Sequence, residues 1–414
     1  MLSYRDNVLF CENISLEKVA RRFGTPVYIY SRAQLVSNFD RFKTAFSDVS
    51  HLICYATKAN ANHAILTTLF SRGAGADITS GGELFRSLEA GFDPKKIVYA
   101  GIGKTAQEIE YALKSGILIF NVESMEELAA INGIAARLKK KASIAFRINP
   151  DVDAQTHRYI TTGTGKAKFG IPYDEAGAAY RMASRLAHID VAGIHCHIGS
   201  QITTVRPFHH AAVKIEKLRV QLQKSGISLR YVNMGGGLGI QYADEVPPTP
   251  GELHDSVIPV FKDFSGTFIF EPGRYIVGNA GVLLVSVVYR KNTGGKNYLI
   301  IDGAMNDLIR PTLYEAYHNI LPAKKSSRPP VKADIVGPIC ETGDFLGLDR
   351  MLALPDPGDR LAVMCTGAYG MAMSSQYNSR LRAAEVMIDG SHIELIRRRE
   401  TYADLIHTEL QGKQ

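Results

Sequence analysis

The sequence predicts an α/β protein in which a (β/α)8 TIM barrel is followed by an antiparallel β-rich C-terminal domain. From residue 50 to 272, short β-branched runs alternate with amphipathic helical stretches, which is typical of parallel βα units. After Gly273, strand-like runs follow one another through connections rich in Gly and Pro, which indicates a separate β domain. We expect the barrel to span residues 27–273, and the β-rich domain to comprise residues 1–26 and 274–414.

Eight apolar, β-branched runs are the expected barrel strands. Closure into a barrel is the simplest arrangement of eight βα units, although a doubly wound open sheet fits the same pattern. The eight runs are Leu52–Thr57, Gly75–Thr79, Ile97–Ala100, Ile117–Val122, Ser143–Ile148, Val191–Ile198, Leu229–Met234 and Thr267–Phe270.

The helices between these strands have recognisable first and last residues. Three of them begin at a Ser or Thr followed three residues later by Glu, the pattern of a capping box; these starts are Ser80, Thr105 and Ser124. Several end at a glycine suited to the left-handed position after a helix: Gly73, Gly91, Gly116 and Gly226.

The β-rich domain is expected to contain five strands and to be joined by the segment around Val8–Phe10. The five runs are Val282–Tyr289, Tyr298–Asp302, Val331–Val336, Arg360–Met364 and Ala384–Ile388.

The composition indicates that the protein resides in a reducing compartment of the cell. The chain has 414 residues, 45% of them apolar, and five cysteines without a CxxC pair, which argues against a disulfide framework. The first residues lack the apolar stretch of a signal peptide, and the longest apolar stretch, Val277–Tyr289, is too short to span a membrane. We therefore expect a cytoplasmic protein without a membrane partner.

The net charge of +7 does not by itself indicate nucleic acid. The basic residues are scattered, and the tight clusters Lys139–Lys141 and Arg397–Arg399 lack interleaved aromatic side chains. Solvated surfaces account for them, and an anionic cofactor or substrate would use part of the charge. No nucleic-acid partner is expected.

Lys58 is the most informative residue. It ends the apolar run from Leu52 and precedes a polar stretch, where a lysine is costly to desolvate unless its amine is used. The obvious use is a Schiff base to a carbonyl, most often that of pyridoxal phosphate. A lysine that extends its amine to solvent at a strand end fits this segment equally well.

Three further strand ends carry groups of the kind that hold a cofactor: His197, Gly235–Gly237 and Glu271–Arg274. In a TIM barrel the chemistry lies at these carboxyl ends. Each has a structural alternative: a packed imidazole, a tight turn, and an ion pair of Glu271 with Arg274. His195 and His197 resemble a zinc pair, but no third ligand is evident, so no metal is expected.

With these residues, the chain resembles the diaminopimelate decarboxylase family, in the alanine-racemase-like, fold-type III group of pyridoxal-phosphate enzymes. The resemblance covers essentially the whole chain. A family serine is replaced by Thr342, which keeps the hydroxyl. The motifs are Tyr55–Asn60, Asn149–Ala154, Lys168–Ile171, His195–Gln201, Gly235–Gly237, Glu271–Arg274, Arg310-Pro311 with Tyr314, Cys340–Asp344 and Gly367–Gly370.

The resemblance implies a role for each barrel residue. Lys58 would carry pyridoxal 5'-phosphate as a Schiff base, His197 would stack on its ring, and Glu271 would keep the ring nitrogen protonated. The expected phosphate ligands are Ser200, the backbone of Gly235, Gly236 and Gly237, the backbone amides of Gly273 and Arg274, and the hydroxyl of Tyr369. Asp77 near the lysine amine and Arg147 near the ring are weaker candidates, for which structural roles fit as well.

Cys340 resembles the residue that returns a proton to the α-carbon after decarboxylation. In the family this loop completes the site of the other subunit, so the resemblance implies a homodimer with active sites at the interface. Taken alone, Cys340 would be a small buried apolar residue.

The function implied is decarboxylation of meso-2,6-diaminopimelate to L-lysine and carbon dioxide, the last step of lysine biosynthesis. Arg274 and Arg310 suit the distal carboxylate and Glu341 the distal ammonium, with Tyr314 and Tyr369 as further substrate-binding residues. The alternatives are decarboxylation of another basic amino acid or carboxylated polyamine, and a non-catalytic regulator that binds pyridoxal phosphate.

Overall fold

The computed structural model describes residues 2–153 and 168–409. The chain divides into two compact units, each described here by itself. The β unit comprises Met1–Ser37, Gln241–Glu245 and Ile276–Gln414, and the barrel unit comprises Asn38–Ile240 and Val246–Tyr275. Ala154, the last residue of one family motif, lies outside the described residues.

Within the described part of the barrel unit, eight parallel strands close into a ring, as predicted. The ring closes because the fourth and fifth strands pair, and a two-residue strand, β10 (Ile171–Pro172), adds to the fifth. In chain order the eight are β5 (His51–Ala56), β6 (Gly75–Ile78), β7 (Ile97–Tyr99), β8 (Ile119–Val122), β9 (Ala142–Asn149), β11 (Ile189–His195), β12 (Tyr231–Asn233) and β13 (Thr267–Phe270).

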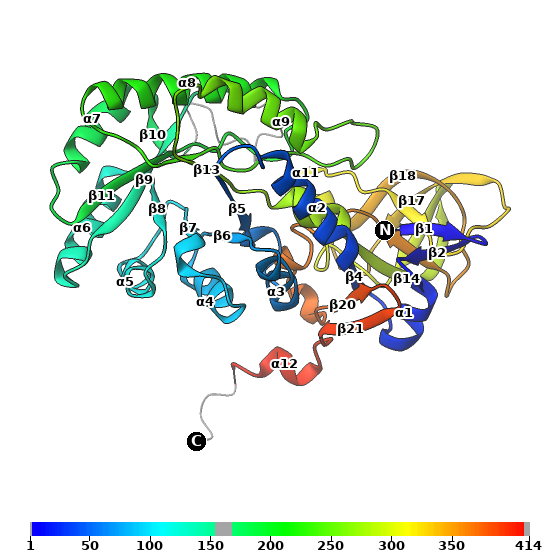
Figure 1. The fold of residues 1–414 in the computed structure, drawn as a ribbon. Coiled ribbons are helices and arrows are strands. Elements are labelled where there is room, and N and C mark those ends of the chain that lie inside the picture. The colour runs from blue at the N-terminus through cyan, green and yellow to red at the C-terminus, as the bar shows by residue number, and fades with distance from the viewer. Residues whose placement is uncertain (1, 154–167, 410–414) are drawn as a thin grey trace. The chain divides into compact units, whose positions relative to one another are not determined.

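Amphipathic helices follow most of these strands and lie outside the ring (Figure 1). They are α3 (His63–Ser71), α4 (Gly81–Glu89), α5 (Ala106–Ser115), α6 (Met125–Arg137), α7 (Tyr173–Ala183), α8 (Arg206–Lys224) and α9 (Pro250–Val257). Most of their buried positions carry apolar residues, so each helix covers its strands through one face.

The expected helix starts are confirmed, with one difference in detail. Thr105 and Glu108 form the full reciprocal capping box of α5. Ser80 and Ser124 cap α4 and α6, but there the glutamate accepts from the backbone N–H before the cap, at Thr79 and Glu123. The box is therefore shifted by one residue at these two helices.

The barrel interior is filled by side chains, so its chemistry is confined to the strand ends. A buried apolar cluster draws one residue from each of six strands: Cys54, Val98, Ile119, Ala145, Ala192 and Ile269. The carboxyl ends of the strands instead carry polar side chains, among them Asp77, Asn121, Asn233 and Glu271.

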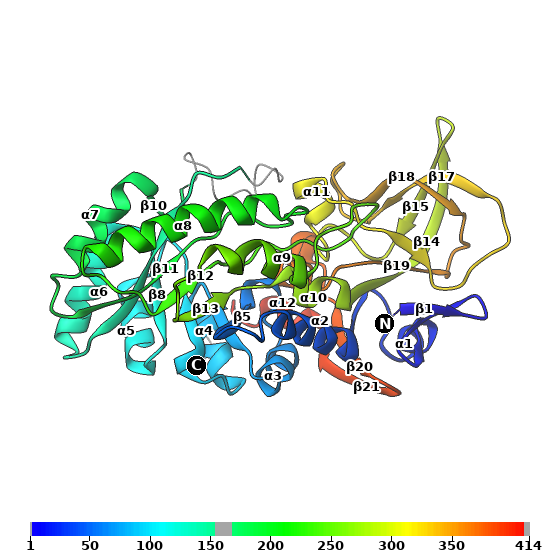
Figure 2. The same cartoon turned by 45° about the horizontal axis from the view of Figure 1, so that its top comes forward.

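The β unit contains a mixed sheet. Its strand order is β18-β17-β15-β14-β4-β20-β21, and β16 and β19 pair beside β14. Most pairs are antiparallel, as expected, but β15–β17 and β4–β20 are parallel. Figure 2 shows the strands β14, β15, β17 and β18 of this sheet. The strands are β4 (Val27–Ser31), β14 (Gly281–Thr293), β15 (Lys296–Ile301), β16 (Ile320–Pro322), β17 (Pro330–Val336), β18 (Phe345–Ala353), β19 (Arg360–Val363), β20 (Ala384–Asp389) and β21 (His392–Arg397).

The N-terminal residues join this unit, as predicted for Val8–Phe10. They form a small antiparallel sheet whose second strand bonds through the Leu9 N–H to the Ala323 carbonyl. One buried apolar cluster contains residues of this sheet, of α1 and of the large sheet. The elements are β1 (Leu2–Arg5), β2 (Val8–Cys11), β3 (Ile14–Ser15) and α1 (Leu16–Phe23), with α10 (Arg274–Val277), α11 (Arg310–Tyr314) and α12 (Tyr402–Ile406) later in the chain.

The compact units differ from the expected ranges near residue 27. The strand β4 lies in the β unit because it hydrogen-bonds between β14 and β20, and the boundary falls inside α2 (Arg32–Ala45). The division of functions between residues 27–273 and the rest of the chain stays a prediction. Among the described helices, none is both long and apolar enough to cross a membrane.

Candidate active site

Lys58 and Asp77 form an ion pair at the carboxyl ends of neighbouring strands. Lys58 lies in the short 3-10 helix Thr57–Ala59 that follows β5, and Asp77 lies in β6. The lysine Nζ is 2.7 Å from Asp77 Oδ2, and the two side chains are 37% and 0% exposed. The Thr57 hydroxyl donates to the Asp77 carbonyl at 2.9 Å. The amine of Lys58 thus has a defined direction at the barrel mouth.

The pKa of Asp77 is raised to about 7. Burial is the main cause and the charge of Glu271 adds to it, while the ion pair and hydrogen bond with Lys58 oppose both. Within the described residues, the buried Oδ1 atom of Asp77 has no hydrogen-bond partner. A group that enters this site can therefore change the protonation of the pair.

Glu271 follows β13 and is held by amides from two other strands. Its Oε1 accepts from Asn121 Nδ2 at 3.1 Å and from Asn233 Nδ2 at 2.6 Å. Its Oε2 lies 3.4 Å from His195 Nε2, and both side chains are buried. Burial raises the pKa of Glu271, but His195, Lys58 and the Asn233 amide together move it below the usual range. The site therefore contains a buried, ionised carboxylate.

The ring of His197 is fixed by the glycine turn. The Gly236 N–H donates to His197 Nδ1 at 3.1 Å, so this nitrogen is unprotonated and the proton of the neutral ring is on Nε2. Burial and the positive charges of Arg147 and Lys58 lower the pKa of His197 well below its usual value. A neutral imidazole ring of fixed orientation suits a stacking role.

The turn itself requires glycine. A Cβ on Gly236 would lie 2.2 Å from the Glu271 carbonyl oxygen. Gly235 has a φ of +68°, and a Cβ there would lie 2.5 Å from the Cys196 carbonyl oxygen. The turn is therefore packed directly against the segments that carry His197 and Glu271.

Two expected phosphate ligands contact each other. The guanidinium of Arg274 donates to the Ser200 hydroxyl, with Nη2 to Oγ at 3.1 Å and Nε to Oγ at 3.3 Å. Arg274 is buried, and Gly273 before it packs against Ala56 and Ala59, where a Cβ would lie 3.0 Å from each of their Cβ atoms. A buried guanidinium beside a hydroxyl is a suitable anion site.

Arg147 anchors the motif that begins at Lys168. Its Nη1 is 2.9 Å from Glu123 Oε1, and the Gly170 N–H donates to Oε2 of the same glutamate at 2.9 Å. The guanidinium lies over the Phe169 ring, 4.5 Å from its centre. Arg147 and Glu123 together therefore hold the Phe169–Gly170 segment in place.

In the β unit, Arg310 and Tyr314 lie at the two ends of α11. The buried Arg310 Nη1 donates to the Tyr242 hydroxyl at 3.0 Å and to His318 Nε2 at 2.9 Å. His318 Nδ1 is 2.7 Å from the Met364 carbonyl oxygen, so the proton is on Nδ1 and Nε2 accepts from Arg310. These two hydrogen bonds hold the guanidinium in place.

Cys340 and Glu341 lie in the loop between β17 and β18, and both are exposed in this chain. The loop is held by Asp344, whose buried carboxylate accepts from the backbone N–H groups of Met305 and Ile339, each at 2.7 Å. Tyr369 follows β19, with a left-handed φ of +58°.

The expected site residues therefore fall into two sets. In the barrel unit the structure brings together Lys58, His197, Ser200, Gly235–Gly237, Glu271, Gly273 and Arg274. The β unit holds Arg310, Tyr314, Cys340, Glu341 and Tyr369.

Several supporting residues, notably Asn121 and Asn233, are not among those that the sequence predicts. Each is an asparagine near the end of an otherwise apolar strand, which is the sequence feature that could have indicated it. Both side chains are buried. His195 was weighed only as a zinc ligand. Among the described residues, no group of three or more His, Cys, Asp or Glu side chains could hold a metal ion.

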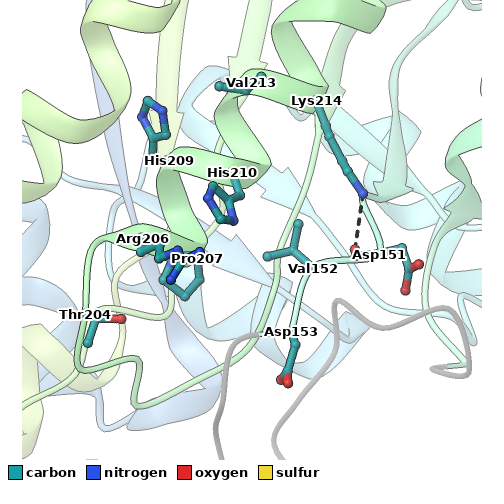
Figure 3. A pocket seen from close by; sticks show the side chains of 10 residues that line it. All are labelled: Asp151, Val152, Asp153, Thr204, Arg206, Pro207, His209, His210, Val213 and Lys214. Atoms are coloured by element: carbon teal, nitrogen blue, oxygen red, sulfur yellow. Dashed lines mark hydrogen bonds between the residues drawn. The ribbon is translucent and has the colours of Figure 1, made fainter.

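A cavity of about 710 Å³ lies between the first turns of α8 and the segment Asp151–Asp153 (Figure 3). Lys214 points toward this segment and donates to the Asp151 carbonyl at 3.2 Å. None of the described residues that line the cavity is an expected cofactor or substrate ligand.

The barrel residues fit pyridoxal phosphate. Three groups lie at strand ends of this barrel: an amine for covalent attachment, a buried ionised carboxylate for the ring nitrogen, and a neutral ring for stacking. The Ser200 hydroxyl, beside Arg274, supplies a phosphate donor, and the unpartnered Oδ1 of Asp77 lies beside the amine.

Comparisons with known proteins agree with this chemistry. Residues 32–278 match the family described as "Pyridoxal-dependent decarboxylase, pyridoxal binding domain". The chain is 49% identical over 410 residues to diaminopimelate decarboxylase of Aquifex aeolicus, which covers 99% of this chain and 97% of the relative. It is 49% identical over 403 residues to the enzyme of the same name from Pseudomonas aeruginosa, covering 97% of each.

Solved structures give the same result. Diaminopimelate decarboxylase from Helicobacter pylori complexed with L-lysine superposes with a TM-score of 0.93 at 40% identity, covering 96% of this chain and 100% of that one. The enzyme of the same name from M. jannaschii in co-complex with L-lysine has a TM-score of 0.95 at 40% identity, covering 100% and 98%.

Proposed function

Because this chain belongs to the diaminopimelate decarboxylase family of pyridoxal-dependent enzymes, we propose that it removes carbon dioxide from meso-2,6-diaminopimelate to form L-lysine, the last step of lysine biosynthesis. The cofactor is pyridoxal 5'-phosphate. One observation carries the proposal: Lys58 and a buried, ionised Glu271 lie at the ends of the neighbouring strands β5 and β13. A covalent amine and an anion for the ring nitrogen are the two protein groups that this chemistry needs.

When bound, the cofactor supplies an electron sink for the pair of electrons left as carbon dioxide departs. Lys58 holds it covalently, and Glu271 keeps a proton on its ring nitrogen because two amides and His195 favour the ionised carboxylate. His197 stacks on the ring. The phosphate is held by the Ser200 hydroxyl, the backbone of Gly235–Gly237, the backbone amides of Gly273 and Arg274, and the hydroxyl of Tyr369.

The remaining residues act on the substrate. Arg274 and Arg310 bind the distal carboxylate, since a guanidinium can form two parallel hydrogen bonds with it. Tyr314 and Tyr369 add hydroxyl groups, and Glu341 binds the distal ammonium. The Arg310 guanidinium is buried and donates to Tyr242 and His318, so its position is set, which supports its role as an anion ligand.

Cys340 returns a proton to the α-carbon. Its thiol lies in an exposed loop of this chain, which supports a role in the site of a second copy. We therefore propose a cytoplasmic homodimer in which residues 27–273 hold the cofactor, and residues 1–26 and 274–414 contribute substrate and partner-site groups.

The test is carbon dioxide release from a panel of substrates by the purified holoenzyme: meso-diaminopimelate, lysine, ornithine, arginine and a carboxylated polyamine. Sites built on polar pairing reject analogues that lack the paired group by roughly 10⁴-fold. We expect kcat/KM for diaminopimelate to exceed the others by about that factor. Comparable values for ornithine or lysine would favour a different decarboxylase, and no release from any substrate would favour a regulator.

A further inference from the structure

In the β unit, the neighbouring residues Tyr377 and Asn378 form hydrogen bonds with Glu341 and Cys340. Tyr377 Oη donates to Glu341 Oε2 at 2.7 Å. Asn378 Oδ1 accepts from the backbone N–H of Cys340 at 3.0 Å. We propose that Tyr377 and Asn378 are positioning residues that set the direction of the Cys340 thiol and the Glu341 carboxylate, an inference that rests on the roles proposed above for these two groups.

The backbone of this turn is strained in the way that functional turns often are. Tyr377–Ser379 is a single 3-10 turn, in which Asn378 has φ +54° and Ser379 has φ +55°. Two successive non-glycine residues in the left-handed region are unfavourable and persist only where the surrounding structure holds them. Asparagine tolerates this region better than most residues, which suits its place in the turn.

The surrounding structure does hold the turn on both sides. Before it, the Ser375 N–H donates to the Asn306 carbonyl and Gln376 Nε2 to Glu400 Oε2, each at 2.9 Å. After it, Arg380 Nη2 donates to the Asp302 carbonyl at 2.8 Å. The turn is therefore a fixed support, to which the Cys340–Glu341 segment is attached.

The two bonds act at the reactive end of the loop. The far end is already held, since the Thr312 hydroxyl donates to the Gly343 carbonyl at 2.6 Å and Asp344 is bonded to two backbone N–H groups. Asn378 fixes the backbone of Cys340, and with it the direction in which the thiol points. Tyr377 occupies one oxygen of Glu341 and leaves the other for an ammonium group.

Within a single chain, a purely structural role does not explain these contacts. Tyr377 is 44% exposed, and Cys340 and Glu341 are exposed as well. Hydrogen bonds in contact with solvent contribute little to stability because water replaces them. The hydrogen bond to Glu341 raises the pKa of Tyr377, so the hydroxyl remains a donor well above neutral pH.

The first experiment is Tyr377→Phe in the holoenzyme, with Tyr402→Phe, which lies 77% exposed in α12, as the matched control. We expect kcat/KM for diaminopimelate to fall about 3- to 10-fold, mainly through KM, as for the loss of one hydrogen bond of ordinary net strength. For 2-aminopimelate, which lacks the distal ammonium, it should not change. Glu341→Gln should abolish the effect of Tyr377→Phe, because the two residues act as one unit.

The second experiment separates the two properties of Asn378. Asn378→Gly keeps the left-handed backbone and removes the acceptor, whereas Asn378→Asp keeps an acceptor oxygen. We expect the glycine variant to lose about 3- to 10-fold in kcat at unchanged KM, as for a loss confined to the transition state, and the aspartate variant to recover most of it. The rate at which iodoacetamide alkylates Cys340, measured by mass spectrometry, should rise in the glycine variant, while that of Cys365 stays constant.

These results separate the inference from the proposed function. Turnover by the wild-type enzyme tests the function, whereas ratios between variants and the alkylation rate of Cys340 test the positioning. The inference is wrong if Tyr377→Phe and Glu341→Gln have independent effects. It is equally wrong if Tyr377→Phe lowers turnover of both substrates alike, or if Cys340 alkylation is the same in Asn378→Gly and wild type.

Discussion

The ammonium group of Lys58 lies 2.7 Å from the carboxylate of Asp77, whose side chain is fully buried. The two residues end neighbouring strands of the barrel, so the register of β5 against β6 sets their distance. The ion pair with a buried carboxylate keeps the lysine amine from turning out into solvent. Asp77, one of the two weaker candidates from the sequence, is thus the direct partner of Lys58.

Lys58 should carry the cofactor. We expect the purified protein to be yellow and borohydride to fix pyridoxal phosphate on Lys58, because its amine is directed by Asp77 and lies in the same barrel mouth as the Ser200–Arg274 pair. Absorbance spectra and peptide mapping check this. A label on another lysine, or a protein that stays colourless after incubation with the cofactor, would contradict the assignment.

Glu271→Gln should lower kcat by at least about 100-fold, a loss of the size seen when one preorganised electrostatic group is removed. The pKa of Glu271 is held below its usual range, so its charge is present at every working pH and the variant cannot be rescued by raising the pH. Steady-state rates from pH 6 to 9 check this, with Glu110→Gln, which removes surface ion pairs with Lys114 and Arg137, as control. Equal rates in wild type and Glu271→Gln would show that the ring nitrogen has another partner.

Arg310→Ala should nearly abolish turnover of diaminopimelate while the absorbance of the bound cofactor stays the same. The guanidinium is the charged group at this position, and its partners Tyr242 and His318 cannot replace it toward a carboxylate. The exposed Arg32→Ala, which breaks a surface ion pair, is the control. If Arg310→Ala lost cofactor absorbance as well, the arginine would be a structural residue.

Mixed dimers should regain activity that the parents lack. Lys58→Ala and Cys340→Ala homodimers are each expected to be nearly inactive, because each lacks one group of the proposed shared site. Mixing and re-dimerising them should place an intact pair of groups in some sites, which an activity assay after subunit exchange detects. Mixed dimers that form and yet remain at the level of their parents would refute sharing.

Asp307 predicts a pH dependence of stability. Burial raises the pKa of Asp307 to about 7, although its carboxylate accepts from the Ala304 N–H. A raised folded pKa stabilises the protein below the unfolded value and loses that effect as pH rises through the folded value. Each pKa unit corresponds to about 1.4 kcal/mol. As pH rises from 4 to 8, the free energy of unfolding of the wild type should therefore fall by roughly 2–4 kcal/mol relative to that of Asp307→Asn. Urea unfolding of both proteins across this range checks it, and parallel curves would contradict it.

Most of the fold could be predicted because it depends on local patterns. The alternation of β-branched runs with capped helices indicated all eight barrel strands and the change of architecture after Gly273. The strand β18 was missed because Gly347, Asp349 and Arg350 interrupt its apolar pattern. It is a strand because β17 pairs with it, and this pairing depends on residues distant in sequence.

The sequence by itself determined the barrel and the identity of the chemical groups, because periodicity and a lysine at a strand end are local features. Only the tertiary structure decided the environment of those groups. Glu271 is ionised because Asn121 and Asn233, 150 and 38 positions away in the chain, donate to one of its oxygens. Tyr377 and Asn378 meet Glu341 and Cys340 across 36 and 38 positions. The contacts of Glu271 follow from barrel closure and strand register, and those of Tyr377 and Asn378 from the folding of the β unit; no short window of sequence contains either.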